Sequence, residues 1–288
     1  MQTTLSWMNA FELAQSANKL APFPDIVCRM NDAIADGTSD AADIGNIILL
    51  DPSLTASLLR AANSPIYMRV KSVSNIDEAV TLLGMQEIRN LAFAVSAADT
   101  VKAFTNPIVS LEHVWKHSLY TAIIADSIDQ GRTNSCGLSL FTAGLLHDIG
   151  QLLMFQQKPD LSWRVMEHAL NHSDGRATYE SERELFGFDH MAVGAELARL
   201  WNFPTEIGAA IAQHHLPFET DAVSDVAVIV HVANSVAVLA ELDSSNIMDA
   251  PQIDARAFEH LGLQLDFVIE SAANAREILP DMMGVFAL

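Results

Sequence analysis

The sequence is poor in cysteine and in positively charged residues. Two cysteines, Cys28 and Cys136, occur among 288 residues, so a disulfide framework is excluded, and their spacing fits no zinc knuckle. We expect two small buried thiols in a reducing compartment. Sixteen lysines and arginines against 36 acidic residues give a formal charge of −20. This balance argues against binding to nucleic acid or to an anionic membrane, because both require clustered cations.

A long hydrophobic run is also missing. No stretch of 18 uncharged apolar residues occurs, so we expect no segment that spans a membrane. The first apolar residues are not preceded by Lys or Arg, which is unlike a signal peptide. We therefore expect a cytoplasmic protein.

Strand-like alternation of apolar and polar residues is scarce, and the dominant period is helical. Apolar residues recur at spacings of three and four within 24–36. The pair Asp51-Pro52 is typical of a helix start. Residues 74–77 have the form of a capping box, and the helix they open is expected to end at Gly84. These patterns predict an all-α protein.

Histidine is missing from the first third of the chain, since all ten histidines lie at or after His113. Residues 1–110 hold 11 acids and 7 bases, whereas residues 111–288 hold 25 acids and 9 bases. The composition changes near the turn at Thr105–Pro107. We predict two helical modules, 1–108 and 109–288, of which only the second carries ligands suited to a transition metal.

The strongest local signal is Gly-Leu-Leu-His-Asp-Ile-Gly at 144–150. His147 and Asp148 are adjacent at the end of an apolar helix, and Gly150 is expected to let the chain bend so that both side chains face inward. A buried Asp is costly unless a cation or hydrogen bonds satisfy it. A divalent metal would satisfy both side chains, and a hydrogen-bonded pair at a helix end is the alternative.

Further histidines stand on other predicted helices. His117 lies on an apolar helix face, His190 opens a helix, and His214-His215 end another. Each alone is more typical of an ordinary surface or core histidine. Together with His147, their convergence from four helices would be typical of a metal site in a helical bundle. His113 lies one turn before His117, at a helix start where exposure is common.

Some aromatic side chains are expected to fill the core, and some polar side chains are expected to cap helices. The aromatic group comprises Phe93, Phe104, Trp115, Trp163 and Trp201. The apolar C-terminal residues 282–286 are expected to fold back onto the chain, although they could dock on a partner. The polar group comprises Arg60, Asn63, Ser64 and Asn75. We first interpret these residues as helix caps and loop hydrogen-bonding groups, and the alternative is that they line a recognition groove between the two halves.

In the order and spacing of these pieces, the chain resembles the HDOD family, a bacterial signalling relative of the HD phosphohydrolases and HD-GYP phosphodiesterases. The resemblance covers roughly residues 17–275. It is carried by Leu20-Ala21-Pro22-Phe23-Pro24, Asp51–Thr55, Leu59–Ser64, Ile76–Gly84, Gly144–Gly150, Gly187–His190, Val193-Gly194-Ala195, Trp201–Pro204, and His214-His215 with Pro217.

The resemblance implies an all-α fold in which an N-terminal helical region packs on an HD-type helical core. By position, it places the metal ligands of HD relatives on His117, His147, Asp148, His190, His214, His215 and Asn234. An imidazole–carboxylate cluster of this kind suits Fe, Mn, Zn or Ni. No organic cofactor is expected.

Three departures from the hydrolytic pattern bear on activity. Asn234 stands where a late Asp is expected, Gln151 stands where HD-GYP enzymes carry Lys, and no Gly-Tyr-Pro motif follows His215. Metal-assisted phosphodiester hydrolysis requires bound metal to activate water and to clamp phosphoryl oxygens. The departures leave metal binding plausible and make phosphate handling poorer.

Two hypotheses follow. The first is a stand-alone HDOD regulatory protein of bacterial signal transduction, which acts through protein–protein or ligand contacts. Its HD site would be degenerate and able to hold a metal, and no catalytic residue is assigned to it. The alternative is a metal-dependent phosphohydrolase acting on a nucleotide or cyclic dinucleotide, in which Asp148 and the histidine cluster would hold the metals and their bridging water.

Overall fold

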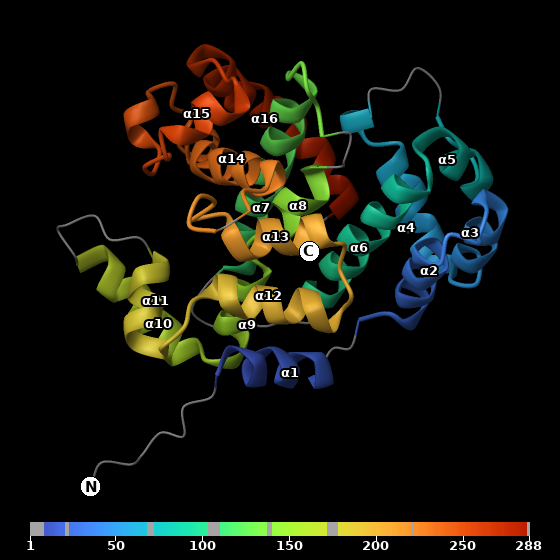
Figure 1. The fold of residues 1–288 in the computed structure, drawn as a ribbon, viewed down its shortest axis with the longest axis horizontal. Helices are drawn as coiled ribbons and strands as arrows, with labels where there is room; N and C mark the ends of the chain where they lie inside the picture. The colour runs from blue at the N-terminus through green and yellow to red at the C-terminus, as the bar shows by residue number, and fades with distance from the viewer. Residues whose placement is uncertain are drawn as a thin grey trace, which may run out of the picture.

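The computed structural model describes residues 9–20, 23–67, 72–102, 110–136, 140–171, 178–220 and 222–286, and these contain helices and no strand (Figure 1). The predicted all-α class is therefore confirmed. The first half comprises α1 Ala10–Leu20, α2 Asp25–Ala35, α3 Ala41–Ile48, α4 Pro52–Ala62, the 3₁₀ turn η1 Pro65–Tyr67, α5 Ile76–Leu83 and α6 Met85–Lys102. The second half comprises α7 Leu111–Gln130, α8 Leu140–Leu146, α9 Ile149–Gln157, α10 Pro159–Asn171, α11 Thr178–Phe186, α12 His190–Leu200, α13 Thr205–Gln213, α14 Asp225–Leu242, the 3₁₀ turn η2 Ile247–Asp249, α15 Arg256–Leu261 and α16 Leu265–Phe286.

Local capping sets several helix boundaries. The Asp51 carboxylate accepts hydrogen bonds from the first backbone N–H groups of α4, and Pro52 takes the first helical position. The Asn75 side chain caps α5 in the same way, and Gly84 ends that helix with φ +85°. The Asn63 amide holds the loop after α4 by exchanging hydrogen bonds of 2.7 and 2.9 Å with the Val73 backbone. The capping interpretation therefore fits Asn75, and Asn63 makes the expected loop hydrogen bonds. It does not fit Ser64, whose buried hydroxyl has no hydrogen-bond partner among the residues that the structure describes, and Arg60 donates to the Ser57 hydroxyl within α4.

Helix α7 is central to the second half, where it packs against α8, α14 and α16 (Figure 1). Helix α14 is long and apolar enough to cross a membrane by length and composition, but 72% of it is buried inside the protein. Its contacts with α7, α8, α13 and α16 account for its apolar composition. Residues on these helices surround the buried histidines.

An aromatic cluster joins the two halves. The Phe23 ring stacks at 5.5 Å on Phe93 and at 4.7 Å on Trp201, and Phe203 meets Phe93 edge-on at 4.9 Å. Helix α1 also crosses to the second half, where it lies against α9 and α12 (Figure 1). The expected boundary at 108/109 and Phe104 lie outside the described residues, and the division into two modules stays a prediction.

The C-terminal helix α16 folds back onto the core as expected. Met282 and Phe286 are buried, and the Trp115 indole Nε1–H donates to the Phe286 carbonyl at 2.8 Å. Trp163 differs from its predicted core position, because it is 50% exposed on α10 at the edge of the bundle. The thiols Cys28 and Cys136 are free and only partly buried.

Candidate metal centre

The junction between α8 and α9 places His147 and Asp148 in the interior. His147 is fully buried and Asp148 is 8% exposed. Gly150 serves close packing rather than the bend we expected: a Cβ at this position would lie 2.0 Å from the His190 carbonyl oxygen and 2.6 Å from the Gly194 nitrogen. The missing side chain lets α9 approach α12 closely enough to bring Asp148 next to His190.

Three buried histidines are each anchored through Nδ1. The Nδ1 of His147 donates to the Gly144 carbonyl at 2.7 Å, and that of His214 to the Ile211 carbonyl at 3.1 Å. The Nδ1 of His190 lies 2.6 Å from Glu182 Oε2, a carboxylate that is itself buried. A proton on Nδ1 leaves the Nε2 lone pair free, which is the usual arrangement of metal-binding histidines.

The three Nε2 atoms converge on the Asp148 carboxylate. Oδ1 lies 3.3 Å from the Nε2 of His190 and 3.3 Å from that of His214. Oδ2 lies 3.1 Å from His147 Nε2, and the Nε2 atoms of His190 and His214 are 3.2 Å apart. The donor atoms of Asp148, His190, His214 and His215 all lie within 4.8 Å of one another.

A second group of donors shares Asp148. The donor atoms of His117, His147 and Asp148 also lie within 4.8 Å of one another. His117 comes from α7, where its Nε2 lies 2.8 Å from Asn234 Oδ1 and its Nδ1 lies 2.9 Å from Glu241 Oε1. The structure therefore brings together all seven residues of the predicted ligand set, with Asn234 reaching the group through His117.

The donor set fits a metal ion. Among the residues that the structure describes, His147 Nε2 and Asp148 Oδ1 are buried atoms with neighbours at ion-pair distance but without a partner in hydrogen-bond geometry. Leaving such atoms unsatisfied costs about 1–3 kcal/mol each. Imidazole and carboxylate donors at one point are what divalent transition metals bind. We conclude that this cluster can hold a metal ion.

The sequence comparisons identify the family of the chain. Residues 20–217 match the HDOD domain. The chain belongs to the HDOD domain family. A curated relative from Treponema pallidum (strain Nichols) is 22% identical over 207 residues, which are 72% of this chain, and this chain spans 39% of that protein's length.

Solved structures share the fold of this HDOD protein. A protein of Shewanella amazonensis SB2B, provisionally named a phosphohydrolase, is 25% identical with a TM-score of 0.74, over 96% of this chain and 98% of its own. An HDOD domain protein of unknown function from Geobacter sulfurreducens is 23% identical (TM-score 0.67, 96% of each chain). A protein of Marinobacter aquaeolei VT8, provisionally named a signal transduction protein, is 20% identical (TM-score 0.69, 98% of this chain and 67% of its own).

Burial and neighbouring charges shift the pKa values of the clustered histidines and of Asp148 in different directions. Burial lowers the pKa of His214 to about 4 despite Asp148, and burial with the neighbouring histidines lowers the pKa of His215 well below its usual value. Burial opposes the charge on His190 too, but Glu182 and Asp148 outweigh it and raise its pKa to about 9. Burial also disfavours the charged form of Asp148, yet His147, His214 and His190 hold its pKa well below its usual range. At neutral pH, His214 and His215 are therefore neutral and Asp148 is ionised, whereas His190 is protonated and must release a proton to bind a metal ion through Nε2.

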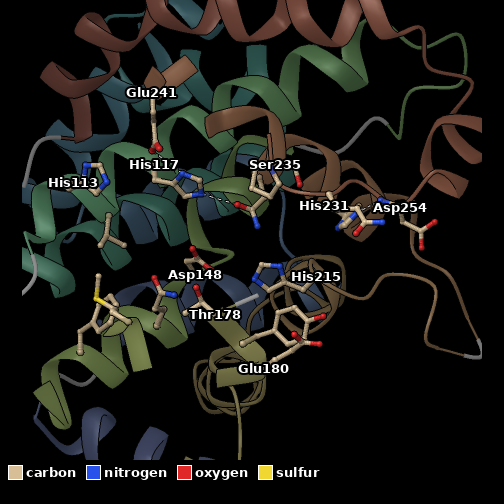
Figure 2. Close-up of a pocket in the computed structure, with 18 of the residues that line it drawn as sticks. His113, His117, Asp148, Thr178, Glu180, His215, His231, Ser235, Glu241 and Asp254 are labelled. Atoms are coloured by element: carbon tan, nitrogen blue, oxygen red, sulfur yellow. Dashed lines mark hydrogen bonds and ion pairs between the residues drawn. The ribbon is translucent and has the colours of Figure 1, made fainter. Parts of the chain in front are cut away.

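A cavity of about 980 Å³ opens beside the cluster (Figure 2). Asp148, His117, His215 and Asp254 are among the residues that line it. Its acidic lining residues are Asp148, Glu180, Glu241 and Asp254. Of the lining residues that the structure describes, Arg256 is the one with a permanent positive charge, and its guanidinium is paired with the Asp254 carboxylate at 2.6 Å.

Three residues that support the cluster were not predicted from the sequence. Glu182 and Glu241 hold the Nδ1 atoms of His190 and His117. His231 bridges two backbone groups, since its Nδ1 donates to the His214 carbonyl at 2.7 Å and its Nε2 accepts from the Asp254 N–H at 3.0 Å. Neither glutamate stands at a spacing from a ligand that would single it out among the acids of its helix.

Proposed function

We propose that this HDOD protein is a regulator in bacterial signal transduction, whose HD site binds a divalent transition metal and does not hydrolyse phosphodiesters. The observation that carries the proposal is the contact between His117 Nε2 and the neutral amide oxygen of Asn234. Hydrolytic relatives would place a carboxylate there. Without it, the site has one anionic donor fewer with which to hold metal and activate water.

The electrostatics of the cavity support a role other than phosphate chemistry. Its acids would repel an anionic substrate, and the Arg256 charge is already paired with Asp254. Gln151, which lines the same cavity, is neutral where HD-GYP enzymes carry Lys. A nucleotide or cyclic dinucleotide would find no free cation among the described lining residues.

A bound ion would have a structural role that fits regulation. We propose that Asp148, His190, His214 and His215 hold it, which would tie the α8–α9 junction to α12 and to the end of α13. When bound, a divalent ion supplies positive charge and Lewis acidity at the cluster. Binding or loss of the ion would change the stability of the packing between these helices. A signalling partner could recognise the resulting change at the protein surface.

The protein partner and the compartment belong to the same proposal. The provisional name of the Marinobacter aquaeolei protein, which shares the fold, supports a signalling partner. We propose a cytoplasmic location, which the two free cysteines and the absence of a disulfide between them support.

Two observations favour the alternative of a metal-dependent phosphohydrolase. The Shewanella amazonensis protein that matches 96% of this chain is provisionally named a phosphohydrolase, and Asp148 faces a cavity large enough for a nucleotide. Under this alternative, the cluster would hold the metal and the cavity would hold the substrate.

The experiment loads the purified full chain separately with Fe²⁺, Mn²⁺, Zn²⁺ and Ni²⁺, measures bound metal, and assays each form with bis(p-nitrophenyl) phosphate and with cyclic dinucleotides. We expect bound metal and no turnover. Turnover that disappears in the variants His147→Ala and Asp148→Ala would overturn the regulatory proposal in favour of the enzyme. Failure to bind any of the four ions would overturn the metal-loaded site.

A further inference from the structure

The candidate centre contains two potential ion positions that share one carboxylate. Asp148 Oδ1 faces the Nε2 atoms of His190 and His214, whereas its Oδ2 faces His147 Nε2. We infer that the centre holds a single ion, at the position formed by Asp148, His190, His214 and His215, and that Asn234 keeps the His117–His147 position empty. This inference rests on the metal binding proposed above, and it assigns the number of ions and the residue that sets it.

The first position has a complete set of donors. His190 and His214 are buried and each turns Nε2 toward Asp148 Oδ1, while Nδ1 is held by Glu182 or by the Ile211 carbonyl. His215 adds a third imidazole within the same 4.8 Å group. Three imidazoles and a carboxylate oxygen complete the four-coordinate shell that ions such as Zn²⁺ prefer.

The second position is short of donors. It has His147, the shared Asp148 oxygen and His117, but both ring nitrogens of His117 are engaged by oxygen acceptors. One of these is Asn234 Oδ1, at 2.8 Å from Nε2, and the other is Glu241 Oε1, at 2.9 Å from Nδ1. Binding an ion here would require His117 to give up the Asn234 contact, with only a neutral amide gained as a further ligand.

Charge balance leads to the same conclusion. Asp148 is the one carboxylate shared by both positions. Two divalent ions on either side of it would repel each other strongly, since two-metal sites place them about 3.5–4 Å apart. Each position has one carboxylate behind a histidine, Glu182 on His190 and Glu241 on His117. The two positions therefore differ at Asn234, which contributes no charge where the second ion would need it. A carboxylate at 234 would supply both the missing donor and the missing negative charge.

The test counts ions in the full chain loaded with Mn²⁺, by elemental analysis and by electron paramagnetic resonance, which distinguishes an isolated Mn²⁺ from a coupled pair. We expect one ion per native chain and two, coupled, in Asn234→Asp. The matched control is Gln252→Glu, which adds the same charge at an exposed cavity residue outside both donor groups and should keep one ion. His214→Ala should lose the ion, and circular dichroism checks that each variant is folded.

Each outcome decides something. Two ions in the native chain would overturn the inference and leave the proposed metal-binding function standing. One ion in both the native chain and a folded Asn234→Asp would overturn the assignment of Asn234, and an ion retained in His214→Ala would overturn the position. A native chain without Mn²⁺, Fe²⁺, Zn²⁺ or Ni²⁺ would overturn the metal-binding proposal itself.

Discussion

The Glu182 carboxylate accepts two hydrogen bonds from one residue, His190: Oε2 lies 2.6 Å from the ring Nδ1 and 2.8 Å from the backbone nitrogen. Both side chains are almost completely buried. The same oxygen therefore satisfies a free N–H at the start of α12 and fixes the orientation of the imidazole. Because the ring is fixed at Nδ1, Nε2 is directed toward Asp148.

Replacing Glu182 by Gln should weaken metal binding without unfolding the protein. The amide keeps the size of the side chain but removes the negative charge behind His190, and loss of such a supporting carboxylate typically costs about 10–100-fold in metal affinity. Competition with a chromophoric chelator measures this. Glu180→Gln, in the same helix and on the cavity wall without a contact to a predicted ligand, is the control. An equal loss of affinity in both variants would show that Glu182 acts only through overall charge.

Gly150→Ala should disrupt the site from outside the ligand set. The new Cβ would lie 2.0 Å from the His190 carbonyl oxygen, and since that atom belongs to the backbone, α9 and α12 must move apart. We expect the free energy of unfolding to fall by about 1–3 kcal/mol, as is typical of overpacking, and metal binding to weaken. Gly208→Ala is the control, because its Cβ would meet only the Ala198 Cβ at 4.0 Å. Urea unfolding and chelator competition measure the two effects, and equal stability of the two variants would contradict the packing argument.

The histidines of the centre could be predicted from the sequence, whereas their supporting residues could not. His147 and Asp148 stand out because a carboxylate follows an apolar helix, and His190, His214 and His117 stand at helix starts, ends or apolar faces. Glu182 and Glu241 are acids in a chain with 36 of them. Their roles depend on which helices pack together, and that is fixed by tertiary contacts rather than by local periodicity.

Dependence on tertiary contacts also explains why the structure differs from the predictions for Gly150 and Trp163. A glycine next to a predicted site is compatible with a bend or with a close approach, and only the position of α12 decides between them. Trp163 lies on an amphipathic helix, but α10 packs mainly on α9 and α11 at the edge of the bundle, which leaves the ring half exposed. Helix starts such as that of α4 were predictable because their capping residues act within a few positions along the chain.

Trp115→Phe should loosen the C-terminal helix. The substitution removes the buried N–H that donates to the Phe286 carbonyl and leaves that carbonyl without this partner. We expect a loss of about 1–3 kcal/mol in the free energy of unfolding, with metal binding retained. Trp163→Phe makes the same change at an exposed ring and should cost less than about 0.5 kcal/mol. Chemical denaturation of both variants tests this, and equal losses would mean that the Phe286 contact does not anchor α16.

Asp126→Asn should stabilise the protein more as the pH rises. Burial, with the nearby charges of Glu87 and Asp129, raises the pKa of Asp126 to about 7 from an ordinary value of 3.8. Between these values the folded state holds a proton that the unfolded state has released, so the native chain loses stability as the pH rises from about 4 to about 7. Asparagine remains neutral and avoids this loss. The melting temperature of Asp126→Asn should therefore match that of the native chain near pH 4 and exceed it by roughly 10 °C above pH 7. The change in pKa from 3.8 to about 7 corresponds to about 4 kcal/mol, and about 1 kcal/mol corresponds to about 2–4 °C in large domains. Asp36→Asn, at the exposed end of α2, controls for the loss of one acid. A difference between Asp126→Asn and the native chain that is constant over this pH range would contradict the prediction.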